Sequence, residues 1–146
     1  MNTTSPEIIS TRLFGASCEQ LFAAFSDPRR LALWWGPKGF RNTFREYDLR
    51  PGGKWLFTMH GPDGKEYPNE KEFSEVVPNE RVVFRHISAT HGFWMTITFA
   101  LEEGKSRLTW QMVFDSELDE GVREFILNAN EENFDRLEAD LQHNPA

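Results

Sequence analysis

The histidines are the side chains of this sequence whose ordinary pKa lies nearest neutrality. There are four: His60, His86, His91 and His143. Strand periodicity places His60 and His86 on opposite faces, so we expect no shared metal site. We expect His86 alone to face the interior, as a general acid or base or as a hydrogen-bonded core residue. Catalysis there would need a second titratable group in the same pocket, and the sequence indicates none. We therefore predict no catalytic residue, metal or cofactor.

Two asparagines, Asn130 and Asn133, lie near the middle of the apolar stripe of a predicted C-terminal helix. Burying an amide without a partner costs about 1–3 kcal/mol. We therefore expect each amide to bond a polar ligand, an ordered water or His86. The alternative is a slight rotation of the helix that brings both amides to water at the rim.

The remaining candidates for chemistry have simpler interpretations. Cys18 is the single cysteine, so neither a disulfide within the chain nor a thiolate cluster can form. It lies in the first turn of a predicted helix, where the dipole could lower the pKa of its thiol, but no histidine is near in sequence. Gly52-Gly53 and the segment 61–64 are typical of turns, not of phosphate-binding loops. We interpret Glu70-Lys71-Glu72 as solvated strand or loop positions.

The elements that would position these residues begin with a predicted strand over 7–14 and two short helices. Ser17 and Gln20 form a capping box that opens the first helix. Asp27-Pro28 opens the second helix, which we expect to end near Trp34, before Gly36-Pro37.

Between Phe40 and Phe114 the apolar side chains alternate with polar ones, which predicts strands with one buried face. Short turns separate these strands, so we expect an antiparallel meander of about six strands.

A capping box at Ser116 and Asp119 predicts a final helix that extends to about Gln142. Its apolar stripe consists of Val122, Phe125, Ile126, Ala129, Phe134, Leu137 and Leu141. One sheet and one long amphipathic helix must bury their faces on each other. We therefore predict a single α+β domain over 1–146, with a curved antiparallel sheet of about six to seven strands wrapped around the last helix.

We expect a ligand cavity between the sheet and this helix, because apolar pockets with few polar groups are typical ligand sites. The predicted lining is Trp35, Trp55, Phe57, Met59, Phe84, His86, Met95, Ile97, Trp110, Met112, Ile126, Asn130 and Asn133. The alternative is that these side chains fill the space themselves. The Trp34-Trp35 pair has three possible roles that the sequence does not distinguish. It could gate a ligand, pack a dimer face or cap the core.

Composition limits the partners. The 23 acidic residues outnumber the 16 basic ones and no basic run occurs, so we expect neither nucleic acid nor an anionic membrane as a partner. The sequence has no run of 18 apolar residues and no signal peptide pattern, so we expect a protein of the cytoplasm.

An ordered set of short motifs carries a family resemblance. These are Phe25-Ser26-Asp27-Pro28, Leu33-Trp34-Trp35-Gly36-Pro37, Asp48-Leu49-Arg50-Pro51-Gly52-Gly53, Gly61-Pro62-Asp63-Gly64, Val77-Pro78-Asn79-Glu80-Arg81-Val82 and Phe134-Asp135-Arg136-Leu137. Over roughly residues 8–141 the sequence resembles the START-like (SRPBCC) superfamily, which includes polyketide cyclases and Bet-v-type proteins. Within it, the chain is most similar to the branch homologous to the C-terminal domain of the activator of heat-shock-protein-90 ATPase. The resemblance implies a helix-grip fold.

In this branch the position of Asn130 is commonly tryptophan and that of Asn133 is often a small residue. This departure would exchange bulk for hydrogen bonding and could open the pocket.

The resemblance implies several functions, because its members include lipid and polyketide binders, cyclases and a chaperone co-factor domain. Our leading hypothesis is a binder of a small apolar or amphipathic molecule. The alternatives are a chaperone-activator-like interaction module and a cyclase- or hydrolase-type enzyme that uses the same cavity. The activator's role depends on an additional N-terminal domain, for which we expect no room in 146 residues. A homodimer stays open.

Overall fold

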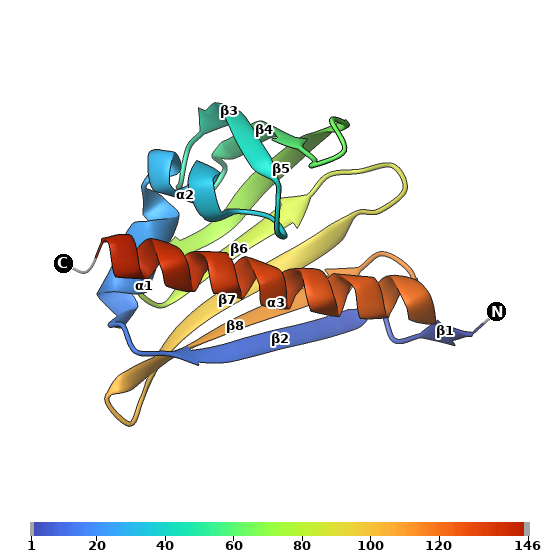
Figure 1. Cartoon of the computed structure of the whole chain (residues 1–146). Helices are drawn as coiled ribbons and strands as arrows, with labels where there is room; N and C mark the ends of the chain where they lie inside the picture. The colour runs from blue at the N-terminus through green and yellow to red at the C-terminus, as the bar shows by residue number, and fades with distance from the viewer. Residues whose placement is uncertain (1, 145–146) are drawn as a thin grey trace.

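A long helix, α3 (Glu120–His143), crosses one face of a curved seven-stranded antiparallel sheet in the computed structural model, which describes residues 2–144 (Figure 1). The strands of this sheet are β2 (Glu7–Phe14), β3 (Arg41–Tyr47), β4 (Lys54–His60), β5 (Glu66–Val77), β6 (Arg81–His86), β7 (Phe93–Glu102) and β8 (Lys105–Phe114), in the spatial order β2-β8-β7-β6-β5-β4-β3. Two short helices, α1 (Cys18–Ser26) and α2 (Pro28–Trp34), connect β2 to β3. The predicted α+β helix-grip fold is confirmed. Residues 1 and 145–146 of the predicted domain lie outside the described residues.

The predicted start signals of α1 and α2 are confirmed. The Ser17 hydroxyl accepts from the Gln20 backbone at 3.0 Å, and the Gln20 side chain accepts from the Ser17 backbone at 2.8 Å. The Asp27 carboxylate accepts from the Arg29 backbone at 3.0 Å, directly before Pro28. These bonds satisfy amide groups that the first turn of a helix leaves without partners.

The start of α3 differs from the prediction, because Ser116 takes no part in its cap. Asp119 is the N-cap residue, and its carboxylate accepts from the backbones of Gly121 and Val122. The preceding pair, β9 (Leu118–Asp119), instead forms a small antiparallel sheet with β1 (Thr3–Thr4). The N-terminal segment therefore holds the beginning of α3.

Two irregularities in strand register bend the sheet around α3. One lies in β3, between Phe44 and Glu46, and the other lies in β5, between Phe73 and Glu75. An extra residue in one strand increases the local bend and twist. The sheet therefore curves toward the helix at its β3–β5 edge (Figure 1).

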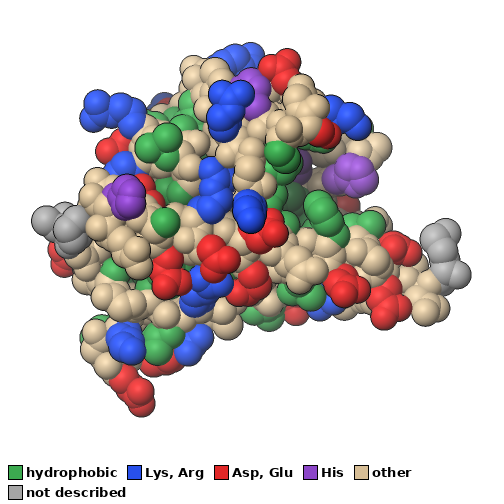
Figure 2. Space-filling view, viewed as in Figure 1, with side chains coloured by type: hydrophobic (Ala, Val, Ile, Leu, Met, Phe, Trp, Pro, Cys, Tyr) green, Lys and Arg blue, Asp and Glu red, His purple; other side chains and the backbone are tan. Residues whose placement is uncertain are grey.

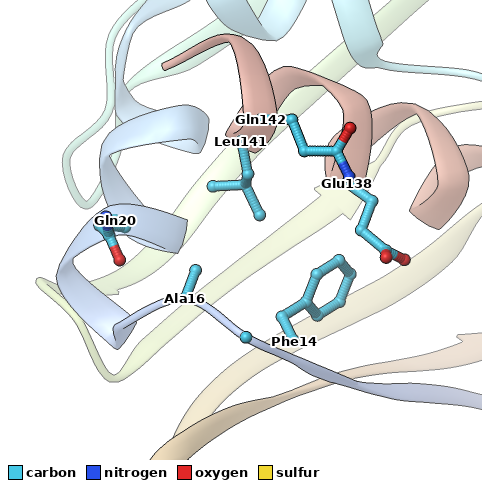
Figure 3. Close-up of a pocket in the computed structure, with 7 residues that line it drawn as sticks. Phe14, Ala16, Gln20, Glu138, Leu141 and Gln142 are labelled. Carbon is cyan, nitrogen blue, oxygen red and sulfur yellow. The ribbon is translucent and has the colours of Figure 1, made fainter. Parts of the chain in front are cut away.

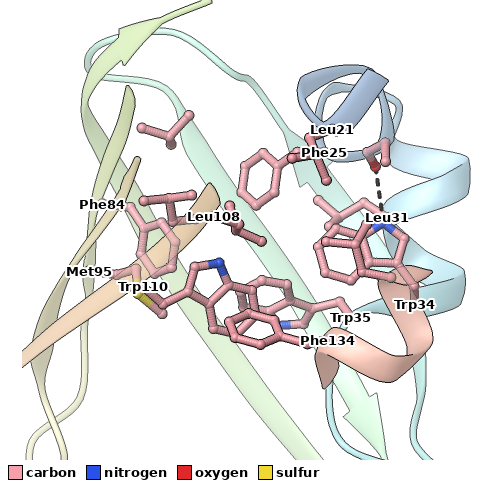
Figure 4. Packing of buried hydrophobic residues seen from close by; sticks show 14 of the residues in the cluster. Leu21, Phe25, Leu31, Trp34, Trp35, Phe84, Met95, Leu108, Trp110 and Phe134 are labelled. Atoms are coloured by element: carbon pink, nitrogen blue, oxygen red, sulfur yellow. Dashed lines mark hydrogen bonds between the residues drawn. The ribbon is translucent and has the colours of Figure 1, made fainter. Parts of the chain in front are cut away.

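A cluster of aromatic rings fills the space between the sheet, α2 and the second half of α3 (Figure 4). The Trp35 ring lies 4.9 Å from that of Trp55 and 5.2 Å from that of Trp110, measured between centroids. Phe134 of α3 packs on Trp110 at 4.8 Å. The Trp34 indole is also buried and donates to the Ala24 carbonyl at 3.0 Å. The Trp34-Trp35 pair therefore packs into the core.

The apolar stripe of α3 is buried only in part. Phe134 and Leu137 are buried, and Ile126 is partly so. Val122 is 47% exposed and Phe125 is 70% exposed, so the prediction that these two face the core is wrong. The first half of α3 stands away from β4–β6, because its first turns pack on the β1–β9 sheet instead (Figure 1).

Within residues 2–144, no helix is both long enough and apolar enough to cross a membrane.

Candidate functional site

The first half of α3 borders a hollow, which we call the open end. Figure 2 shows this face hollowed between α3, the α2–β3 connection and the β6–β7 loop. One cleft of about 460 Å³ lies between residues 90–92, residues 114–119 and the helix side chains Val122, Phe125 and Ile126. A second cleft of about 310 Å³ lies between Phe125 and residues 37–40. Phe125 borders both clefts, so this exposed ring stands at the centre of the open end.

Aromatic rings lead from the larger cleft into the interior. Phe114 lines the cleft, and its ring lies 4.9 Å from that of Phe93. Phe93 in turn stacks on His86 at 4.8 Å with an interplanar angle of 27°. Phe93 and His86 are both only partly buried, so a chain of ring contacts connects the cleft wall at Phe114 to the inner face of the sheet at His86.

A lysine, Lys71 of β5, lies at the inner end of this surface and is only 3% exposed. Its Nζ atom lies 5.3–5.6 Å from the centroids of four rings, which belong to Trp55, Phe57, Phe84 and Phe93. The faces of aromatic rings attract a cation. Among the described residues no carboxylate pairs with this amine within 4.0 Å. Burial lowers the pKa of Lys71 to about 7, because the charged form loses its hydration.

His86 of β6 is the direct strand partner of Lys71. The Lys71 amine lies 3.0 Å from His86 Nδ1 and donates to Asn69 Oδ1 at 3.3 Å. Burial, and after it the charges of Lys71, Arg85 and His91 in that order, lower the pKa of His86 to about 3. The imidazole is therefore neutral near pH 7, and two titratable groups converge at one buried point.

The interpretation of Lys71 as a solvated position is wrong. Its parity along β5 carried the signal: Asn69, Lys71 and Phe73 share the inward face, whereas Glu70 and Glu72 point outward and are exposed. Phe73 is a buried ring, so counting back from it in steps of two places Lys71 inside. Only the rarity of buried lysines argued against that assignment.

The predicted cavity lining divides into two groups. The larger group is buried and belongs to the core: Trp35, Trp55, Phe57, Phe84, Met95, Ile97, Trp110 and Met112. Met59, His86 and Ile126 are only partly buried. Ile126 lines the larger cleft of the open end, and His86 connects to it through Phe93.

The two asparagines are buried, and both have protein partners. Asn133 Oδ1 accepts from the Gly36 backbone at 3.1 Å, and its Nδ2 donates to the Trp34 carbonyl at 2.7 Å. Asn130 Nδ2 donates to Ser10 Oγ at 3.1 Å. None of these hydrogen bonds involves His86, which we expected as one possible partner of the two amides. Asn133 therefore holds the α2–β3 connection against α3.

Arg136, one helical turn beyond Asn133, reinforces this connection. Its guanidinium donates to the carbonyl oxygens of Leu33, Trp35, Gly36, Pro37 and Phe40, at 2.6–3.1 Å. Desolvation lowers the pKa of Arg136. At Gly36 φ is +99°, and a Cβ would lie 2.7 Å from the Met59 side chain. The connection therefore fits closely against both α3 and β4, and it forms one wall of the open end.

Of the other candidates, His91 lines the larger cleft of the open end, whereas His60 and Cys18 lie apart from it. His60 Nε2 lies 2.8 Å from the Thr43 hydroxyl, and its ring also pairs with Glu66. Cys18 lies 3.4 Å from Ser106 Oγ. Within residues 2–144, no group of three or more potential metal ligands is present.

A further cleft of about 310 Å³ lies at the opposite end of α3, beside the start of α1 (Figure 3). Its carboxylate, Glu138, is engaged by Arg12 at 2.7 Å. Phe14, at the base of the cleft, is buried in the core. This cleft therefore offers no free reactive group, and the open end is the stronger candidate.

Solved structures share this architecture. A protein from Chromobacterium violaceum is 24% identical, with a TM-score of 0.81 over 92% of this chain and 95% of its own. A protein from Arthrobacter aurescens is 21% identical, with a TM-score of 0.85 over 98% of this chain and 92% of its own. An AHSA1 protein from Silicibacter pomeroyi is 22% identical, with a TM-score of 0.78 over 94% of this chain and 99% of its own. At these identities the likeness establishes the fold.

No curated protein matches the sequence. The family model described as "Activator of Hsp90 ATPase homolog 1-like protein" matches residues 15–142, which is most of the chain. The chain therefore belongs to the family of activator of Hsp90 ATPase homolog 1-like proteins.

Proposed function

We propose that this protein binds a small, largely apolar molecule at the open end, between the sheet and the first half of α3. The observation that carries the proposal is the hollow beside Phe125, whose wall residue Phe114 contacts Phe93, which in turn stacks on His86 beside the buried Lys71. Concave apolar sites with a few convergent polar groups are typical of small-molecule binding.

The test is a titration of the protein with 2-naphthylmethanol, a neutral aromatic alcohol, followed by backbone amide chemical shifts. We expect saturable shifts at residues 90–92, 114–119 and 122–129. Native mass spectrometry of the freshly purified protein, followed by denaturing extraction, would identify any molecule that it carries.

Two matched variants of α3 distinguish the open end from other clefts. Ile126→Trp adds bulk to the larger cleft, and we expect it to weaken binding at least about tenfold through steric exclusion. Leu141→Trp adds the same bulk at the opposite end of the helix and should leave affinity unchanged. Equal affinity in both variants would refute this location.

A chaperone-related interaction is the second candidate, favoured by the family and by the exposed Val122 and Phe125 side chains. Stoichiometric co-purification with a chaperone, lost on Phe125→Ser, would favour it over small-molecule binding.

A further inference from the structure

We infer that Lys71 is a covalent site, at which its amine forms a reversible imine with an apolar aldehyde that enters through the open end. This inference rests on the proposed function, because the same hollow would admit the aldehyde. It adds the chemical class of the ligand and the atom to which the ligand bonds.

The hydrogen bonds of Lys71 leave its lone pair available. A neutral amine has two N–H bonds and one lone pair. With the amine as donor, one N–H bond points to Asn69 Oδ1 and the other to His86 Nδ1. The lone pair then takes the remaining tetrahedral direction, among the surrounding rings. A lysine held by a carboxylate would stay protonated, but no such pair is formed here within the described residues.

The surroundings also favour the product. Imine formation releases water, and the buried apolar site disfavours the return of water to the C=N bond. If the imine takes up a proton, the four rings around Nζ stabilise the resulting cation as they would an ammonium. A desolvated lysine in an apolar pocket is an established type of activated nucleophile.

Imine formation needs only the Lys71 amine, the aldehyde and a group that transfers protons. The nitrogen lone pair attacks the carbonyl carbon, and the carbonyl oxygen takes up a proton to give a carbinolamine. That proton is one of the two on the amine; the nitrogen loses the second as the C=N bond forms and the C–O bond breaks, and this proton joins the departing hydroxyl to give water. His86 Nδ1, 3.0 Å from Nζ, is positioned to carry a proton between the nitrogen and the departing oxygen. No oxidation or reduction occurs.

Near neutral pH, the Lys71 amine is unprotonated to a sufficient extent for the reaction. The groups packed around Nζ come from β4 (Trp55 and Phe57), β6 (Phe84 and His86) and β7 (Phe93), with Asn69 on the same strand. Of these, only His86 titrates, and it is neutral above its low pKa. With a pKa of about 7, half of the Lys71 amine is unprotonated at pH 7. The corresponding fraction for an ordinary lysine is about one in 2,500.

The experiment treats the full-length protein with 2-naphthaldehyde and cyanoborohydride at pH 7. The reductant converts an imine to a stable secondary amine, which peptide mass mapping locates. We expect Lys71 to be labelled at least about 100-fold faster than any exposed lysine, because of the difference in unprotonated fraction. Lys71→Met should abolish the fast labelling, whereas Lys54→Met, which removes an exposed lysine of the same sheet, should leave it intact.

The outcomes separate the two proposals. Slow labelling spread over exposed lysines, with no loss in Lys71→Met, overturns the covalent site. If 2-naphthylmethanol nevertheless binds the wild-type protein, the proposed function stands without the imine. If neither the alcohol nor the aldehyde binds, both proposals fail. Circular dichroism of Lys71→Met establishes that its loss of labelling does not reflect unfolding.

Discussion

At the scale of single residues, the buried Lys71–His86 pair opposes folding. Near neutral pH, Lys71 must lose a proton that it would hold when exposed, because burial lowers its pKa to about 7. His86 loses such a proton only at more acidic pH, where burial keeps the imidazole neutral. The four rings around Lys71 and its bonds to Asn69 and His86 offset only part of this cost. Strongly shifted titratable groups that converge in a buried place are more typical of functional sites than of structural cores.

Replacing the lysine should therefore stabilise the protein, in a way that depends on pH. Between pH 7 and pH 10.5 the unfolded chain holds a proton on Lys71 that the folded protein does not, so the free energy of unfolding of the wild type rises with pH. Below pH 7 the full penalty applies, about 3–5 kcal/mol. We expect Lys71→Met to be more stable than the wild type by that amount at pH 7, with the advantage shrinking toward pH 10.5.

Urea unfolding of both proteins at pH 7, 8, 9 and 10 measures this difference. The folded His86 is neutral across that window, and an unfolded histidine with an ordinary pKa near 6.5 is mostly neutral at pH 7 and almost entirely so from pH 8, so its contribution is small. A stability difference that is the same at every pH would mean that Lys71 has an ordinary pKa in the folded protein. Lys54→Met serves as the control for removal of a lysine from the sheet.

At the scale of elements, the α2–β3 connection owes its position to α3 more than to its own sequence. Pro37 and two glycines, Gly36 and Gly39, give this connection little regular structure. Asn133 and Arg136 instead bind its backbone from the helix. The wall of the open end is therefore fixed by side chains that lie almost a hundred residues away in the sequence.

Removal of the guanidinium should loosen this wall. We expect Arg136→Met to lower the free energy of unfolding by about 2–4 kcal/mol, because several backbone carbonyls lose a charged donor. Hydrogen exchange should accelerate most at residues 36–40. Arg136→Lys should lie between the two, because an ammonium has only three donors. A uniform increase in exchange over the whole sheet would contradict a local role.

The difference between local and long-range contacts explains what could be predicted from the sequence. Caps and periodicity depend on neighbouring residues, so β2, α1, α2 and the meander could be predicted. The segment around Lys71 could be predicted only as strand or loop, because the burial of this lysine depends on rings from three other strands. The partners of Asn133 and the exposure of Phe125 depend on where α3 lies on the sheet, which no local pattern specifies.

At the scale of the whole molecule, the space between sheet and helix has a packed half and an open half. In the packed half, Trp110 lies in contact with both Trp35 and Phe134. Ion pairs of Arg12 with Glu131 and of Arg30 with Asp140 fasten α3 to β2 and α2. The open half has Phe125 at its centre. We therefore expect stability and binding to respond to different substitutions.

A pair of phenylalanine variants on α3 tests this separation. Phe134→Ala should lower the free energy of unfolding by about 3–5 kcal/mol, because it leaves a cavity in the core. Its affinity for 2-naphthylmethanol, measured at a temperature where it is folded, should be unchanged. Phe125→Ser should change stability by no more than about 0.5 kcal/mol but weaken binding several-fold. Reversed effects of the two variants on affinity would show that the ligand lies in the packed half.

The open half also suggests where proteins of this fold can differ in sequence. Solved structures that share only 19–25% of its residues keep the same arrangement of sheet and helix. Because Val122 and Phe125 are exposed whereas Phe134 is buried, we expect the chain to tolerate changes at the first two positions without unfolding. If the open end binds ligands as proposed, we expect new specificities to arise there by single substitutions, without a compensating change in the core. On the same proposal, we expect this half of the molecule to be a suitable starting point for engineered receptors.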